Sequence, residues 1–140
     1  MEMALSCISR LVGLNPLSPA VMTIPSNGKK SMRFPLNFAM PGEDCPPPPK
    51  SSEDSGGSCT VVSFPERVVA VRTFSGASVE AAVRQADREL RNLCTTHGLR
   101  ISEDSRDVLC FAQYDAIFSM GKRRTEVWVD LTDNHPWSTK

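Results

Sequence analysis

The stretch that decides the fold runs from residue 67 to residue 98 and reads RVVAVRTFSGASVEAAVRQADRELRNLCTTHG. Its first part, residues 67–74, is rich in β-branched side chains, which is typical of a β-strand. After Gly76 the apolar residues recur at the three- and four-residue spacing of an α-helix, and Gly98 stands where a helix ends. The stretch therefore predicts a strand followed directly by a helix, with Ser78 as the N-cap and Glu80 near the positive end of the helix dipole.

The predicted helix is amphipathic. Glu80 with Arg84 and Asp87 with Arg91 form i,i+4 pairs on the face that we expect to be solvated. The face that we expect to be buried consists of Val79, Ala82, Val83, Ala86, Leu90 and Leu93.

Two further strands follow this helix, at residues 108–114 and 125–131. In the second of them the side chains alternate, because successive residues of a strand point to opposite faces. One face holds Val127, Val129 and Leu131, and the other holds Glu126, Trp128 and Asp130. With the preceding strand and helix, these two strands complete a βαββ unit.

The N-terminal part of the chain repeats the helix–strand–strand order of this unit. Residues 3–13 carry one apolar stripe at helical spacing, and residues 20–24 are a short apolar strand. After a turn, residues 32–40 alternate strictly between two faces, which predicts a half-buried strand. Pro35 cannot donate a hydrogen bond to a neighbouring strand, so this strand is expected at an edge or to be locally irregular.

The predicted order, α-β-β, linker, β-α-β-β, indicates an α+β protein of duplicated βαββ units in which the first unit is truncated. We expect a fuller version to have strands before Met1. Without the leading strand, the strand at residues 34–40 is expected to be an open edge that allows self-association.

The 140 residues are enough for one domain. Residues 41–60 are rich in Pro, Gly and Ser and have no apolar periodicity, so we expect a flexible loop there. We expect residues 132–140 to be a loose tail.

Charge and cysteine content exclude several function classes. The 16 basic and 16 acidic residues give a net charge of +0, which argues against a nucleic-acid partner. Five cysteines without a CxxC pair argue against a disulfide framework or a structural zinc site, and they favour a cytoplasmic location. No stretch approaches the ~20 apolar residues of a membrane span. No nucleophile elbow or Gly-rich phosphate loop occurs, so we expect no enzyme.

Four segments, in the right order, resemble the SOUL family of haem-binding proteins. They are VMTIPS (residues 21–26), FAMPG (38–42), ERVVAVRTFSG (66–76) and YDAIFSMGKRRTEVWVDL (114–131). They are similar, respectively, to the family's MTxP segment, to the turn before its Pro-rich loop, to its strand ending in an aromatic-x-Gly turn, and to its Tyr-Asp-Pro-Pro … Arg-Arg-Asn-Glu-Val-Trp ending. The sequence departs from this pattern at Ala116 and Ile117, where the family often has two prolines, and at Thr125, where it has Asn.

This resemblance implies a curved sheet or distorted barrel flanked by two helices. It implies that haem or a free porphyrin binds in an apolar groove beside the first helix, for carriage, buffering or sensing. The residues that would contact the ligand are Leu5, Ile8, Arg10, Leu11, Met22, Lys122 and Arg123. The basic ones among them would hold the propionates through charge-assisted hydrogen bonds.

Other interpretations of these residues stay open. Arg10 can equally be a solvated helix residue, the Lys122–Arg124 run a solvated turn, and the apolar residues simply core. No metal ligand is expected: His97 is placed to stabilise the end of a helix, and His135 lies in the tail. The alternative function is a protein-interaction module on the same fold with the ligand pocket lost by truncation.

Overall fold

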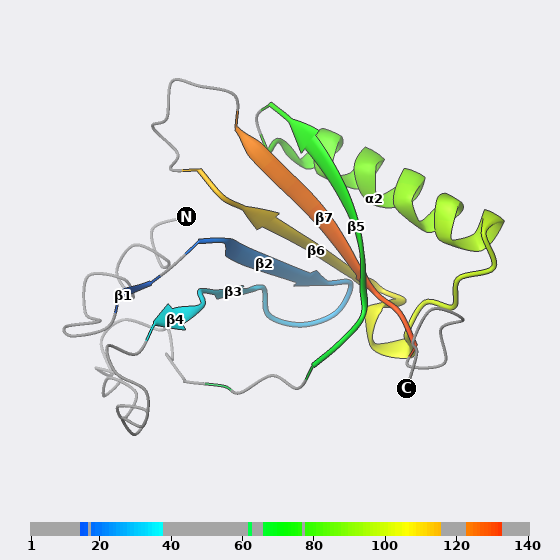
Figure 1. Cartoon of the computed structure of the whole chain (residues 1–140), viewed down its shortest axis with the longest axis horizontal. Helices are drawn as coiled ribbons and strands as arrows, with labels where there is room; N and C mark the ends of the chain where they lie inside the picture. Colours follow the sequence, from blue (N-terminus) through cyan, green and yellow to red (C-terminus); the bar gives the residue numbers. More distant parts are fainter. Residues whose placement is uncertain are drawn as a thin grey trace.

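The computed structural model describes residues 15–16, 18–37, 62, 66–76, 78–115 and 123–132. Within this part of the chain, five strands form an open antiparallel sheet in the order β3-β2-β6-β7-β5, and one helix crosses one of its faces (Figure 1). The elements of this layer are β2 (Ala20–Pro25), β3 (Ser31–Arg33), β5 (Val69–Ser75), α2 (Glu80–Thr96), β6 (Val108–Gln113) and β7 (Arg124–Asp130). A short 3-10 turn, η2 (Glu103–Ser105), precedes β6.

The predicted strand–helix–strand–strand unit is present as β5-α2-β6-β7, and the α+β class is confirmed. The hairpin β2–β3 extends the same sheet, because β2 pairs antiparallel with β6 with Val21 opposite Ala112 and Ile24 opposite Leu109. Of the first predicted unit, only these two strands are described. The helix expected at residues 3–13 lies outside the described residues, so the duplication and the second helix stay predictions.

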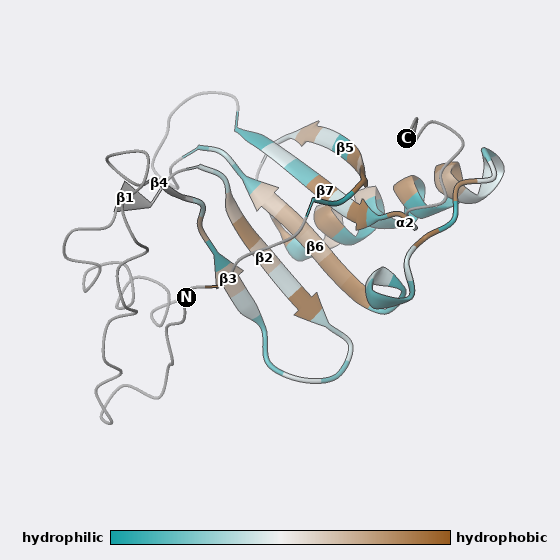
Figure 2. Cartoon of the chain, turned by 60° about the horizontal axis from the view of Figure 1, so that its bottom comes forward, coloured by the Kyte–Doolittle hydropathy of each residue, from teal (hydrophilic) through white to brown (hydrophobic). Residues whose placement is uncertain are grey.

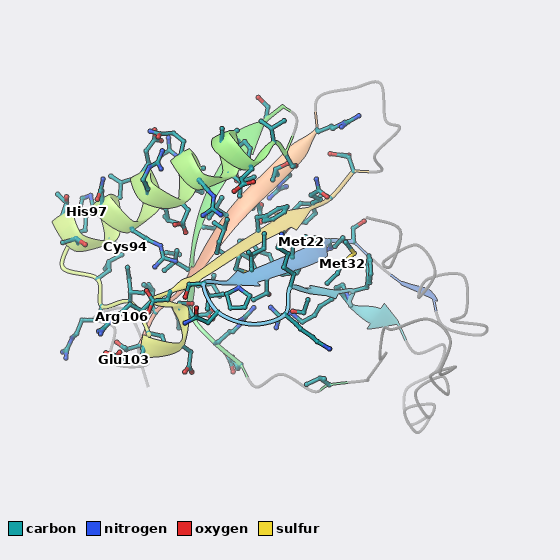
Figure 3. All side chains as sticks on the ribbon, turned by 180° about the vertical axis from the view of Figure 1, so that it is seen from behind. Met22, Met32, Cys94, His97, Glu103 and Arg106 are labelled. Carbon is teal, nitrogen blue, oxygen red and sulfur yellow. The ribbon has the colours of Figure 1, made fainter. Side chains whose placement is uncertain are left out.

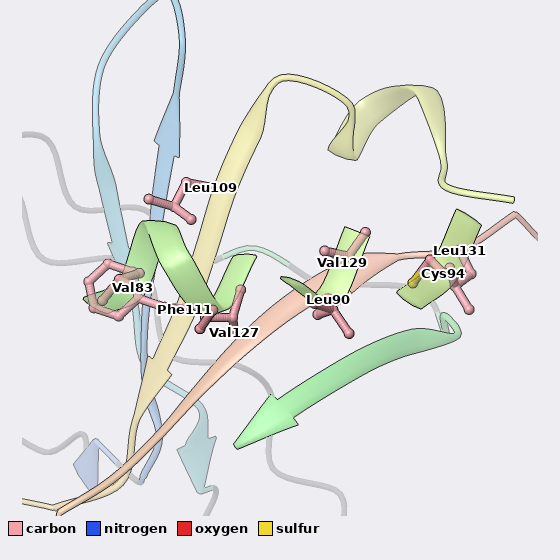
Figure 4. Packing of buried hydrophobic residues seen from close by; sticks show 9 residues of the cluster. Val83, Leu90, Cys94, Leu109, Phe111, Val127, Val129 and Leu131 are labelled. Atoms are coloured by element: carbon pink, nitrogen blue, oxygen red, sulfur yellow. The ribbon is translucent and has the colours of Figure 1, made fainter. Parts of the chain in front are cut away.

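The core lies between α2 and the sheet (Figures 2 and 4). Figure 2 shows apolar residues along β6, β2 and the side of α2 that meets the sheet. Figure 4 shows the α2 side chains over β6 and β7. Each fully buried aliphatic side chain contributes about 1.5–3 kcal/mol to folding. The buried members of this cluster are Val83, Ala86, Leu90, Cys94, Leu109, Phe111, Val127, Val129 and Leu131.

Two details predicted for the start and face of the helix are wrong. The N-cap is Val79, with extended backbone and no capping hydrogen bond, and its side chain is 56% exposed. Ser78 instead accepts a hydrogen bond from Gln113 (2.6 Å) and shares one with Thr125 (3.0 Å), which ties the start of the helix to the sheet. Leu93 is 45% exposed, because it lies at the margin of the buried stripe.

The end of the helix and its ion pairs follow the prediction. Gly98 has a φ of 68°, which favours glycine, and Leu99 donates its N–H to the Cys94 carbonyl (2.8 Å). The pairs of Arg84 with Glu80 (2.7 Å) and of Arg91 with Asp87 (2.9 Å) both form. The Arg91 pair is more buried than the sequence predicted, because its guanidinium also donates to the Val108 carbonyl (2.8 Å).

The strand predicted at residues 32–40 is not continuous. β3 ends at Arg33, and after Phe34 and Pro35 the chain forms β4 (Leu36–Asn37), which pairs with β1 (Asn15–Pro16) instead of the main sheet. The prediction of an unpaired edge at residues 34–40 is therefore wrong for Leu36–Asn37. In the described part of the chain, the outer strands of the main sheet are β3 and β5.

Other predicted regions fall largely where nothing is described. Residues 38–40 of the predicted strand and the loop at 41–60 lie outside the described residues, as does the tail after Thr132. Thr132 is the last residue described, and it donates its N–H to the Arg100 carbonyl (3.0 Å).

Candidate functional site

Met22 and Met32 lie on an apolar area of the sheet, on the same side as α2. Met22 stands opposite Met32 on β3 and opposite Phe111 on β6. Because side chains alternate, Ile24 and Leu109 share this face. We call these five residues, Met22, Ile24, Met32, Leu109 and Phe111, the methionine face.

Helix α2 covers only part of the sheet, and the methionine face extends beyond it. The helix packs mainly on β5 and β7 and touches the margin of β6. Figure 3 shows Met22 and Met32 on the β2–β3 hairpin, well away from His97 at the end of the helix. Met22, Ile24 and Met32 are half-buried, while Leu109 and Phe111 are each 8% exposed. Flexible, polarisable thioethers beside other apolar side chains suit contact with an aromatic ligand.

A second apolar feature, a groove of about 320 Å³, lies between α2 and β5. Val68 and Leu93 beside it are 40% and 45% exposed, respectively. The Cys94 thiol in it is buried, and burial raises its pKa, so the thiolate that would bind a metal is disfavoured. No motif in the sequence pointed to this groove, because Leu93 was predicted to be buried and Val68 to lie within an ordinary strand. Its lining residues are Val68, Val69, Ala70, Val71, Leu90, Leu93, Cys94, His97, Leu99 and Leu131.

The opposite face of the sheet carries a polar cluster centred on Glu126, which is 4% exposed. One carboxylate oxygen accepts hydrogen bonds from the Tyr114 hydroxyl (2.8 Å) and from Trp128 Nε1 (2.9 Å). The other oxygen accepts from the Arg124 guanidinium, which also lies over the Tyr114 ring at 4.7 Å from its centroid. We call Tyr114, Arg124, Glu126 and Trp128 the Glu126 cluster.

This cluster holds Glu126 in its charged form. Burial by itself raises the pKa of Glu126, but the hydrogen bonds from Trp128, Tyr114 and Arg124 outweigh it and lower the pKa below its ordinary value. Burial and the bond to Glu126 raise the pKa of the Tyr114 hydroxyl. The sequence predicted Glu126 on the face of the strand opposite Val127 and Val129, and this is confirmed. The alternation did not predict that Tyr114, Arg124 and Trp128 cover Glu126 there.

Further hydrogen bonds join the residues of this cluster across the end of the β6–β7 pair. The Asp115 carboxylate accepts the Arg124 backbone N–H (2.7 Å), and Tyr114 donates its N–H to the Arg124 carbonyl (3.3 Å). Tyr114 and Asp115 at the end of β6 are thus joined to Arg124 and Glu126 in β7. Arg124 is therefore engaged by Glu126, although its side chain is 59% exposed.

The structure locates two of the seven ligand-contact residues predicted from the resemblance. Met22 lies in the methionine face, and Arg123 is half-buried immediately before β7. The remaining residues, Leu5, Ile8, Arg10, Leu11 and Lys122, lie outside the described residues.

No group of three or more His, Cys, Asp or Glu side chains is arranged to hold a metal ion in this part of the chain. None of the helices described has both the length and the apolar character needed to cross a membrane.

Comparison with known proteins identifies the family. Residues 13–130 match the family model described as SOUL heme-binding protein. The match covers most of the chain, which therefore belongs to the SOUL heme-binding protein family, as the four sequence segments predicted. No protein with a curated description matches the chain significantly.

Proposed function

We propose that this protein binds haem or another tetrapyrrole against the methionine face and serves as a carrier, buffer or sensor rather than as an enzyme. The observation that carries the proposal is the position of Met22, opposite both Met32 and the buried Phe111, at the margin of the core that α2 covers, where Met22 and Met32 stay half-buried. Membership in a family described as heme-binding supports the same ligand class.

The protein side chains would hold the ligand mainly by apolar contact. The described residues fit this role, since the methionine face has no charged side chain and its members are half-buried or buried. Leu5, Ile8 and Leu11 would extend the apolar contact. Arg10, Lys122 and Arg123 would meet the propionates through charge-assisted hydrogen bonds. A bound haem would supply a redox-active iron for sensing or would itself be the cargo.

Met32 offers a direct test, because it lies on the outer strand β3 and is not part of the central core cluster. Met32→Asp places a charge against the macrocycle, and we expect the affinity for hemin to fall by at least about tenfold. Met32→Leu conserves volume and apolar character, so its affinity should stay within about threefold of the wild type. Titration followed by the Soret band and by Trp128 fluorescence measures both.

Thermal melting tests whether each of the two Met32 variants is folded. A histidine double variant serves as the control for the position of the site. His97 lies at the end of α2, away from the methionine face, so the double replacement of His97 and His135 by Ala should leave hemin affinity almost intact (Figure 3). Binding unaffected in folded Met32→Asp, or a large loss in the histidine double variant, would contradict the proposed site.

The basic residues are tested by changing the ligand's charge. Replacing Arg10, Lys122 and Arg123 together by Gln should weaken a dicarboxylate porphyrin more than its dimethyl ester. Each lost bond should cost about 1.5–3 kcal/mol where it is shielded from water and less where it is exposed. Arg88→Gln, on the exposed face of α2, is the matched control and should change neither affinity. Equal losses for both ligands would rule out a propionate role.

The alternative function, a protein-interaction module, is favoured by a different observation, the outer edge of β5.

A further inference from the structure

The backbone N–H and C=O groups of successive β5 residues point alternately to the partner strand β7 and to the outer edge of the sheet. Leu131 donates its N–H to the Val68 carbonyl (2.9 Å), so the backbone groups of Val68 point toward the β7 side. Because backbone groups of successive residues point to opposite sides of a strand, Val69, Val71 and Thr73 direct their N–H and C=O groups to the outer edge. Among the described residues, no strand pairs with this edge.

This edge lacks the devices that normally protect an outer strand. β5 is seven residues long and contains neither Pro nor Lys. Its charged residue, Arg72, is already paired with Glu89 of α2. Val71 is 47% exposed and Val68, just before the strand, is 40% exposed. An edge whose backbone groups pair with no described strand, and which exposes valines, is a template for a further strand.

We propose that a second copy of this chain pairs with β5 in antiparallel fashion, with Val71 on the two-fold axis opposite the partner's Val71. In this register Val69 lies opposite the partner's Thr73, so every outward-facing residue meets another outward-facing residue. Each such pair exchanges two backbone hydrogen bonds. The exposed Val71 side chains meet each other and leave water.

Charge and shape favour a second copy at this edge. With Val71 on the axis, Arg72 lies opposite the partner's Ala70, so the two Arg72 side chains do not face each other as they would in a register centred on Arg72. The net charge of the chain is +0, so two copies do not repel each other overall. On the helix side, Val68 lies opposite the partner's Phe74, beside the apolar groove that both α2 and β5 line.

Proline substitutions test the backbone direction. Val71→Pro removes an N–H that points outward, so the monomer should keep its ladder to β7 and melt cooperatively, while the dimer dissociation constant rises by at least about tenfold. Ala70→Pro removes an N–H that points to β7 and should lower the melting temperature instead. Sedimentation of the full chain over a range of micromolar concentrations measures the dimer.

A charge at the axis gives an independent test that does not alter the backbone. Val71→Glu places two like charges opposite each other and should also yield a monomer. Val62→Glu makes the same change at a valine that is 59% exposed and outside the strands, and it should leave the dimer intact. A wild type that is monomeric throughout, even if it binds an extended peptide at this edge, would overturn the proposal, as would dimers that persist in folded Val71→Pro and Val71→Glu. Hemin titration of the same variants measures tetrapyrrole binding independently of the dimer, so the two proposals can fail separately.

Discussion

Replacing Val127 with aspartate is expected to abolish cooperative unfolding. Val127 is fully buried between α2 and the sheet, on a strand that pairs with both β5 and β6. A carboxylate there is desolvated among apolar side chains, and its charged cross-strand neighbour, Arg72, is already paired with Glu89. Such a change costs about 4 kcal/mol or more. Small domains are stable by only about 5–15 kcal/mol, so most or all of the stability would be lost. Thermal melting followed by circular dichroism measures this.

The matched control is the same substitution at Val79, with the opposite expected sign. Val79 is the exposed N-cap of α2 and makes no capping hydrogen bond. Aspartate at an N-cap accepts a backbone N–H and meets the positive end of the helix dipole, so Val79→Asp should stabilise the protein by about 0.5–2 kcal/mol. A cooperative, wild-type melt for Val127→Asp would show that the core is not where the structure places it.

Removing the Glu126 carboxylate is expected to have the second largest effect. Glu126→Ala leaves the Tyr114 hydroxyl, the Trp128 indole N–H and the Arg124 guanidinium without their common acceptor. Breaking a buried charged network by removing one partner costs about 3–5 kcal/mol, although the exposure of Arg124 places this case at the lower end. Urea unfolding gives the free energy directly.

Two further variants separate the charge from the hydrogen bonds. Glu126→Gln keeps the shape and one carbonyl acceptor, so it should recover part of the loss. Glu103→Ala removes a carboxylate from an exposed pair with Arg106 and should cost no more than about 1 kcal/mol. Equal, small effects at Glu126 and Glu103 would show that the cluster contributes no more than a surface ion pair.

The same cluster makes stability depend on pH in a defined direction. The pKa of Glu126 is lower in the folded protein than its ordinary value of 4.5. Its contribution is therefore fully present above pH 4.5 and is lost as the pH falls through the lowered folded pKa. Glu126→Gln should remove this part of the acid sensitivity.

The sequence predicted the local elements well because their signals are local. The spacing of apolar residues predicts α2, and Gly98 predicts where it ends. The alternation of Val127 and Val129 with polar residues predicts β7. The errors arise where a distant residue competes. Ser78 is a good N-cap by type, but Gln113 and Thr125 engage its hydroxyl. Pro35 signals an irregularity, but the sequence does not show that β4 then pairs with β1.

The candidate site was predictable only in part for the same reason. Met22 was predicted through the family resemblance, but its neighbour Phe111 was not. The contact depends on the pairing of β2 with β6, and no local pattern reveals which strands pair. The sequence likewise predicts only which face of its strand Glu126 occupies. Its burial depends on Tyr114, which directly follows the neighbouring strand β6.

The pairing of β2 with β6 also has a consequence for the order of folding. Thr23 and Cys110, which face each other across this seam, are 87 positions apart in the chain, whereas β5, α2, β6 and β7 are consecutive. Contacts that close a long loop cost more chain entropy and tend to form late. The β2–β3 hairpin should therefore dock last onto a preformed β5-α2-β6-β7 unit. Met22 and Met32 belong to the hairpin, whereas Phe111 belongs to the preformed unit. The methionine face is therefore complete only after the hairpin has docked. A ligand that contacts both halves would hold the seam closed.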